Sequence, residues 1–150
     1  MHCNALLTAG KTQVLCGGGL HVHLRHAGGH IGSEILAHGR DMGRHPRRLR
    51  DERGIEIRWV PLTADGQLDL TDLDQLLDGA KVFSFTAMSN VLGTLPPVTK
   101  LCSAAHDAGA LAVVDACQYV PHNATDVQAW GADLVAFSSH KMCGPSGIGM

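Results

Sequence analysis

The sequence predicts an α/β protein with a mostly parallel sheet and helices on its faces. From residue 55 onward, segments with the pattern of strands alternate with segments of helical pattern, an order typical of parallel α/β sheets. Two strand segments, 111–115 and 133–138, are almost continuously apolar, as expected for strands that are covered on both faces. Polar residues follow both segments, and ligands of such sheets bind beyond the carboxyl ends of strands.

The first elements of this pattern lie within residues 55–79. Residues 55–62 alternate between apolar and polar side chains, which predicts a strand. An Asp-Gly pair marks a turn at 64–67. Leucines at helical spacing predict a short amphipathic helix over 70–79, with Thr71 as its N-cap and Gly79 as its end.

The next elements lead to the two apolar strands. Residues 81–86 predict another strand, and residues 89–94 predict a loop. A second helix is expected from 97 to 108, because its apolar residues recur on one face. A short helix is expected around 126–130, before the strand at 133–138.

Composition divides the chain into two parts. Residues 1–50 hold seven basic and two acidic residues, a net charge of +5, whereas the remaining residues carry a net charge of −7. We therefore expect a basic segment rich in glycine and histidine over 1–53 and the α/β core over 54–150. Within the first part, only 4–8 and 11–16 have a weak strand or helix pattern.

Composition also excludes several classes of protein. The net charge of −2 gives the whole chain no bias toward nucleic acid or acidic lipid. No apolar run is long enough to span a membrane. The five cysteines form no C-x-x-C pair and are odd in number, which favours a reducing compartment, and we expect the cytoplasm.

A lysine and an aspartate stand at the ends of the two apolar strands. Lys141 follows the strand at 133–138 and precedes a loop rich in glycine and hydroxyl groups, and Asp115 ends the strand at 111–115. An enzyme that uses pyridoxal 5'-phosphate needs this pair of groups. The lysine forms an imine with the cofactor, and the acid keeps the pyridine nitrogen protonated so that the ring accepts electrons.

Four ordered motifs give residues 55–150 a resemblance to the class V aminotransferases, and within them to cysteine desulfurases and selenocysteine lyases. The motifs are Pro61-Leu62 with Asp65-Gly66-Gln67-Leu68-Asp69, Ser89-Asn90-Val91-Leu92-Gly93-Thr94, Val114-Asp115-Ala116-Cys117-Gln118 with Pro121-His122, and Phe137-Ser138-Ser139-His140-Lys141 with Gly144-Pro145-Ser146-Gly147-Ile148-Gly149. The resemblance implies part of the large domain of a fold-type I transferase that depends on pyridoxal phosphate.

The resemblance implies a role for six residues. Lys141 matches the catalytic lysine that binds the cofactor, Asp115 matches the acid that pairs with the pyridine nitrogen, and Gln118 matches the residue that hydrogen-bonds the phenolic oxygen. The remaining matches are Ser138 and His140, which contact the cofactor phosphate, and Asn90, which lies near the substrate carboxylate.

The sequence also departs from the family pattern. Residues 1–50 contain no Gly-Thr-Thr-like phosphate cradle, and the motif of the histidine that stacks on the pyridine ring is absent, with His38 or His45 as its only substitutes. In the family, a smaller C-terminal domain and the persulfide-forming cysteine lie beyond the position of Met150. We therefore expect a fragment of the enzyme, with no desulfurase turnover by this chain alone.

Other features of the sequence favour simpler explanations. Cys117 and Cys143 are interpreted as packing residues, because nothing marks them as exposed thiols of lowered pKa. The histidines at 21–30 match no structural zinc spacing, so no metal site is predicted. The basic stretch 44–53 has no interleaved aromatic residues, which favours a solvated helix face over a nucleic-acid contact.

The function that the resemblance implies is that of a cysteine desulfurase. Such an enzyme converts L-cysteine or a related amino acid, transfers sulfur to one of its own cysteines, acts as a homodimer and passes sulfur to an acceptor protein. The alternatives are another class V chemistry (selenocysteine lyase, kynureninase or epimerase) and a non-catalytic remnant that serves as a binding module. Whether this chain is itself an enzyme stays open at this point.

Overall fold

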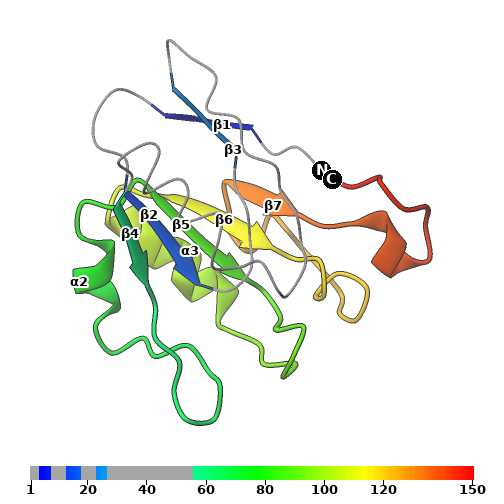
Figure 1. Cartoon of the computed structure of the whole chain (residues 1–150), viewed down its shortest axis with the longest axis horizontal. Coiled ribbons are helices and arrows are strands. Elements are labelled where there is room, and N and C mark those ends of the chain that lie inside the picture. The colour runs from blue at the N-terminus through cyan, green and yellow to red at the C-terminus, as the bar shows by residue number, and fades with distance from the viewer. Residues whose placement is uncertain (1–3, 8–12, 18–22, 27–55) are drawn as a thin grey trace.

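The central element of the computed structural model is a five-stranded sheet in which every strand pair is parallel (Figure 1). The structure describes residues 4–7, 13–17, 23–26 and 56–150. In spatial order the strands are β4 (Glu56–Trp59), β2 (Gln13–Gly17), β5 (Val82–Thr86), β6 (Leu111–Asp115) and β7 (Leu134–Ala136). The predicted α/β class with a mostly parallel sheet is confirmed.

The first third of the chain contributes strands that the sequence indicated only weakly. β2 lies between β4 and β5 in the sheet, and β1 (Asn4–Leu7) pairs in parallel with β3 (His23–His26) as a separate two-stranded sheet. The weak signals at 4–8 and 11–16 thus coincide with strands, whereas β3 was not predicted. The basic stretch 44–53, His38 and His45 lie outside the described residues.

Within the described residues, two α-helices pack against one face of the sheet. They are α2 (Leu73–Leu77) and α3 (Val98–Asp107), and Figure 1 shows α3 behind the strands. Alternate residues of the central strands, Phe83, Phe85, Ala112 and Val114, join Leu77, Leu101 and Ala105 of the helices in one buried cluster. Burying each phenylalanine contributes about 1.5–3 kcal/mol, so this face supplies much of the stability. Asp115 is one step out of phase with Val114 and therefore lies on the opposite face.

The predicted helix at 70–79 is shorter and begins differently. Thr71 is not its N-cap: the cap position is Asp72, whose side chain makes no capping hydrogen bond. The Thr71 hydroxyl instead donates to Asp69 Oδ1 at 2.6 Å, so it is not available to cap the helix. Gly79 adopts a φ of +67° just beyond the helix, which fits its predicted role as the end.

Residues 126–130 form a turn and not the predicted short helix. The Asp126 carboxylate accepts the backbone N–H groups of Gln128 and Ala129, both at 3.0 Å, as a helix cap would. Gly131 then adopts a φ of +68°, which ends the turn before a second turn of helix forms.

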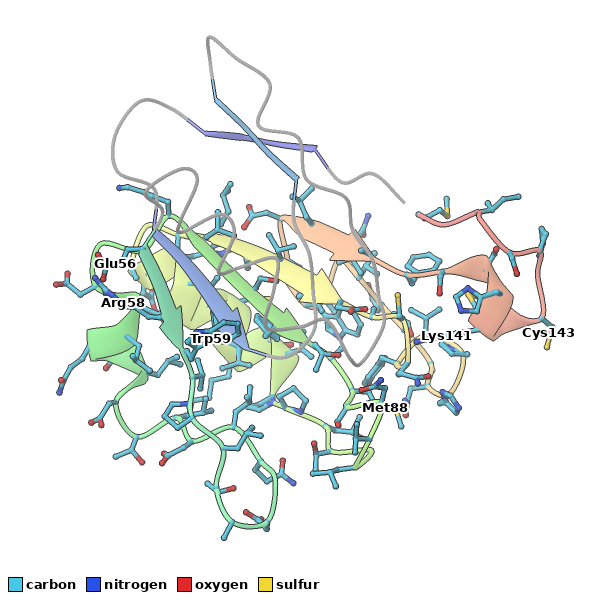
Figure 2. The ribbon with its side chains drawn as sticks, in the orientation of Figure 1. Glu56, Arg58, Trp59, Met88, Lys141 and Cys143 are labelled. Carbon is cyan, nitrogen blue, oxygen red and sulfur yellow. The ribbon has the colours of Figure 1, made fainter. Side chains whose placement is uncertain are left out.

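A side chain at the edge of the sheet fixes the end of α2. Arg58 on β4 donates from Nη1 to the carbonyl oxygens of Leu76 at 3.0 Å and Asp78 at 2.7 Å, and from Nε to Glu56 at 2.9 Å (Figure 2). A cation at a helix C-terminus satisfies carbonyls that have no partner within the helix. Arg58 therefore joins the edge strand to the helix that packs beside it.

A side-chain contact also joins α3 to the start of β7. His106 Nε2 lies 2.9 Å from Asp133 Oδ2, and the same oxygen accepts the N–H of Ala112 at 2.7 Å. Ala112 is fully buried on β6. The carboxylate of Asp133 thus satisfies a backbone donor that burial would otherwise make costly.

Replacing Asp133 with alanine is expected to lower the free energy of unfolding by about 1–3 kcal/mol, because the N–H of Ala112 loses its acceptor. Replacing His106 with alanine removes only a half-exposed side-chain contact with Asp133 and should cost about 0.2–1 kcal/mol. Urea unfolding of both variants would measure the two changes. Equal losses would contradict the role given to the Ala112 hydrogen bond.

Candidate active site

Asp115 occupies the carboxyl end of β6, between two other strand ends. It pairs in register with Thr86 on β5 and with Ala136 on β7. Its exposed fraction is only 7%, whereas aspartate is almost never buried without a partner. The backbone oxygen of Asp115 accepts the N–H of Ala87 at 2.8 Å. The Thr86 hydroxyl lies 3.3 Å from the same oxygen, but its shorter hydrogen bond, at 2.9 Å, goes to the carbonyl of Met88. The Ala87 bond helps to fix the position from which the carboxylate projects.

The Asp115 carboxylate is held by the residue two places further along the chain. The backbone N–H of Cys117 donates to Asp115 Oδ1 at 2.9 Å. Burial raises the pKa of the Asp115 carboxyl above its usual value, and the hydrogen bonds from Cys117 and the positive charge of Lys141 act in the opposite direction. The cost of burying the charge is the largest of these effects, so a cation beside the carboxylate would stabilise it.

Lys141 lies on the 3-10 helix η1 (Ser139–Met142), just beyond β7. Its positive charge is near enough to lower the pKa of both the Asp115 carboxyl and the Cys117 thiol, against the larger effect of burial. Figure 2 shows Lys141 on the side of η1 nearer the strand ends, whereas Cys143 lies on the outer side. Lys141 thus follows the strand that neighbours β6, and its role beside Asp115 stays a prediction.

A hairpin-like loop holds the lysine in place. Ser139 donates its hydroxyl to the carbonyl oxygens of Ile148, at 2.9 Å, and of Pro145. The backbone bridges Ser138 to Gly149 in antiparallel fashion. The loop that begins at Lys141 thus returns along the segment that precedes it, which restricts where η1 can lie.

The two predicted phosphate contacts have different surroundings. The Ser138 hydroxyl oxygen is buried and makes no hydrogen bond of normal geometry within the described part of the chain, although Ser138 lies near enough to the Cys117 thiol to lower its pKa slightly. An unsatisfied buried hydroxyl costs about 1–3 kcal/mol, so a ligand oxygen at this position would be favoured. His140 is exposed on η1, and no hydrogen bond joins its ring to the other site residues that the structure describes.

Gln118 and Asn90 lie in turns beside the site. Gln118 is partly buried in the turn that follows Cys117, and Asn90 is exposed in the turn that follows β5. The hydroxyl of Ser89, and not the side chain of Asn90, orders the latter turn by accepting the N–H groups of Val91 and Leu92 at 3.2 and 3.1 Å. No hydrogen bond links the side chains of Gln118 or Asn90 to Asp115 or Lys141 among the described residues, so their roles stay predictions.

Cys117 is the thiol nearest to the reactive groups, but its chemistry is suppressed. It is 8% exposed, and burial together with the charge of Asp115 raises the pKa of its thiol to about 11, against smaller effects of Ser138 and Lys141. The thiolate is the nucleophilic form of cysteine. At neutral pH the Cys117 thiol therefore stays protonated, and its burial favours the packing role that the sequence indicated.

The residues of this site fit pyridoxal phosphate. Asp115 is a buried carboxylate for which a protonated ring nitrogen would be a partner, Lys141 supplies an amine whose charge reaches that carboxyl, and Ser138 offers a buried hydroxyl without a hydrogen bond of normal geometry. A fixed acid, an amine and an oxygen-binding group are the parts from which a site for this cofactor is built.

The comparisons with known proteins agree with this geometry. The family model described as aminotransferase class V matches residues 45–150. A probable cysteine desulfurase of Streptomyces coelicolor is 48% identical over 103 residues, which is 68% of this chain and 25% of that protein. A cysteine desulfurase of Yersinia pseudotuberculosis is 47% identical over the same shares of the two chains. The chain thus spans about a quarter of the length of these relatives.

Solved structures support the same conclusion. The apo structure of a cysteine desulfurase from Thermococcus onnurineus superposes with a TM-score of 0.70 and 30% identity, covering 92% of this chain and 30% of that one. A cysteine desulfurase of Escherichia coli matches with a TM-score of 0.69, covering 99% of this chain and 31% of that one, and at 24% identity it supports the fold alone.

Fold and site together define part of an α/β enzyme of the kind that uses pyridoxal phosphate. The chain belongs to the class V aminotransferase family, because the family model covers more than half of it. This confirms the predicted resemblance. Proteins of this family depend on pyridoxal phosphate, so the predicted cofactor is that of the family.

Sequence reasoning missed three groups that build the site. They are the backbone N–H of Cys117, the hydroxyl of Thr86 and the hydroxyl of Ser139. The pattern Asp-x-Cys indicated only an acid at a strand end, although an aspartate often accepts the N–H two residues further on in a turn. Ser138 and Ser139 are adjacent and identical in type. The sequence therefore does not indicate which hydroxyl is available to a ligand and which one bonds to the loop.

The burial of two thiols predicts a clear order of cysteine reactivity. The pKa of Cys102 is also raised to about 11, mainly by burial. At neutral pH, iodoacetamide should label the exposed Cys143 and leave Cys102 and Cys117 unmodified in the folded chain, as read by peptide mass spectrometry. In urea all three should react. Labelling of folded Cys117 as fast as Cys143 would contradict the buried position.

The raised pKa of Asp115 predicts that this residue destabilises the cofactor-free chain as pH rises. A carboxyl whose pKa is higher in the folded state holds its proton more tightly there, so its contribution to stability falls above the unfolded pKa of about 3.9. Asp115→Asn should therefore unfold at higher urea concentration than the unchanged chain at pH 7, and this advantage should disappear near pH 3. A less stable variant at pH 7 would contradict the assignment.

Proposed function

We propose that this chain carries the cofactor-binding part of a cysteine desulfurase, which converts L-cysteine to L-alanine and transfers the sulfur to a cysteine of the enzyme. The observation that carries the proposal is a buried Asp115 at the end of β6, with Lys141 just beyond the neighbouring strand β7 and its charge acting on that carboxyl. The relatives with 44–50% identity bear the name cysteine desulfurase, established or probable, which favours this chemistry over the other reactions of the family.

The residues of the chain would divide the work as follows. Bound pyridoxal phosphate would supply an electron-accepting ring. Asp115 would hold the proton on the ring nitrogen, and its burial strengthens that contact because little water screens it. Lys141 would bind the cofactor covalently and then move a proton at the Cα of the amino acid.

The remaining roles extend from these two groups. Ser138 and His140 would bind the phosphate, the former through its buried hydroxyl. Gln118 would donate a hydrogen bond to the phenolic oxygen of the ring, and Asn90 would lie near the substrate carboxylate. These assignments come from the motif matches, and the positions of the four residues around the strand ends support them.

Sulfur transfer needs a thiol other than the buried cysteines of the described chain. Cys102 and Cys117 have raised pKa values of about 11, which opposes nucleophilic attack on sulfur. The proposal includes a cysteine of the enzyme that accepts the sulfur, a second subunit in a homodimer and a separate protein that takes the sulfur onward. It also includes a cytoplasmic location.

No helix in the described part of the chain is both long enough and apolar enough to cross a membrane.

The covalent contact of Lys141 provides the test. Pyridoxal phosphate added to the purified chain should produce the absorbance band of an imine, and borohydride reduction should fix the cofactor mass on the peptide that contains residue 141. Lys141→Ala should lose both signals. Lys100→Ala is the matched control. Lys100 is an exposed residue of α3, the helix that covers one face of the sheet, and it does not lie at the carboxyl ends of the strands. Equal signals from the unchanged chain and Lys141→Ala would overturn the proposal.

A further inference from the structure

The turn that carries Gln118 is held by a side chain that has no role in the proposed function. His122 Nδ1 lies 2.6 Å from the backbone oxygen of Gln118. Because a carbonyl oxygen only accepts, the ring must carry its proton on Nδ1 and donate it. The ring itself is exposed, so it contacts the turn from the solvent side.

The local sequence explains why a side chain takes this position. The turn begins like a helix, since the N–H of Val120 bonds to the oxygen of Ala116 at 3.0 Å. Pro121 has no N–H and cannot continue that series. The N–H of His122 then bonds to Tyr119 at 3.1 Å, which leaves the Gln118 oxygen to the imidazole ring.

The far side of the same turn is anchored independently. Asn123 donates from its backbone N and from Nδ2 to the oxygen of Tyr119, at 2.9 and 3.3 Å. The Tyr119 ring packs edge-on against the buried Trp130, with 5.1 Å between ring centroids. The near side begins at Cys117, whose N–H binds Asp115. Gln118 is the residue between these anchors, and its backbone is held there by the His122 ring.

We propose that His122 is a positioning residue that orients Gln118 toward the cofactor site. The proposal rests on the function given above, in which Gln118 donates to the phenolic oxygen. A peptide plane fixed at the Gln118 carbonyl restricts the direction of the Gln118 side chain. A free carbonyl would let the plane rotate and would weaken the hydrogen bond that this side chain makes.

Two variants separate the hydrogen bond from the bulk of the ring. His122→Phe keeps an aromatic ring without the donor, whereas His122→Asn places an N–H at the same number of bonds from Cα as Nδ1. His106→Phe is the control, because His106 is another exposed histidine with a hydrogen bond but lies in the last turn of α3, which leads to the opposite end of β6. Amide hydrogen exchange of residues 117–123 is measured without cofactor, and the absorbance of added pyridoxal phosphate is titrated with pH.

The expected result has two parts. His122→Phe should speed exchange in the turn several-fold and raise the pH at which the cofactor band changes by about half a unit to one unit, because a donor to the phenolic oxygen favours the more negative form of that oxygen. His122→Asn should restore both values, and His106→Phe should leave both unchanged.

Each other outcome points to a different failure. Faster exchange in His122→Phe with an unchanged cofactor titration would overturn the positioning role and leave His122 as a structural contact only. If His122→Phe leaves hydrogen exchange of residues 117–123 unchanged, the claim that the His122 ring holds this turn is wrong. If the unchanged chain gives no cofactor band, the proposed function fails and this inference fails with it, whereas the exchange data would still report on the His122 hydrogen bond.

Discussion

Burial of the Asp115 carboxylate is the constraint around which the described structure is arranged. A carboxylate with 7% exposure has lost most of its hydration, and one hydrogen bond from Cys117 at 2.9 Å replaces only part of it. The amine of Lys141 helps, but burial still dominates the pKa of the acid. Without a cationic ligand this residue is therefore an energetic cost, and under the proposed function the same charge would hold a protonated ring. Stability must come from elsewhere in the fold.

The buried charge of Asp115 and the apolar residues that stabilise the fold lie on opposite faces of the sheet. Along β6, Ala112 and Val114 face the helices and join the buried cluster with Phe83 and Leu101, whereas Asp115 lies on the other face at the strand end. Alternation of side chains in a strand makes this division possible within consecutive residues. Parallel pairing then brings Thr86, Asp115 and Ala136 into one row, so that groups from three strands and the following turns meet at one edge.

Much of this arrangement could be predicted because it depends on local pattern. The strand at 111–115 and its terminal acid follow from a run of apolar residues, and the parallel pairing of that strand with the one before Lys141 follows from the α/β order. The place of β2 between β4 and β5 could not be predicted, since nothing in its own five residues specifies distant partners. Side-chain competition explains the errors in the helices: Asp69 binds the hydroxyl of Thr71, and Gly131 stops the turn that Asp126 begins.

The site residues fall into an inner and an outer group, and the division bears on function. Asp115, Cys117 and the hydroxyl of Ser138 are buried, and the role proposed for each concerns the cofactor or the packing beneath it. His140 and Asn90 are exposed, and their proposed partners are a phosphate and a substrate carboxylate, both anions. Exposed polar groups bind anions weakly until water is excluded, because solvent screens the interaction. In the proposed function, the inner group therefore offers the stronger electrostatic contact, to a cationic ring nitrogen, and the outer group offers weaker contacts to anions.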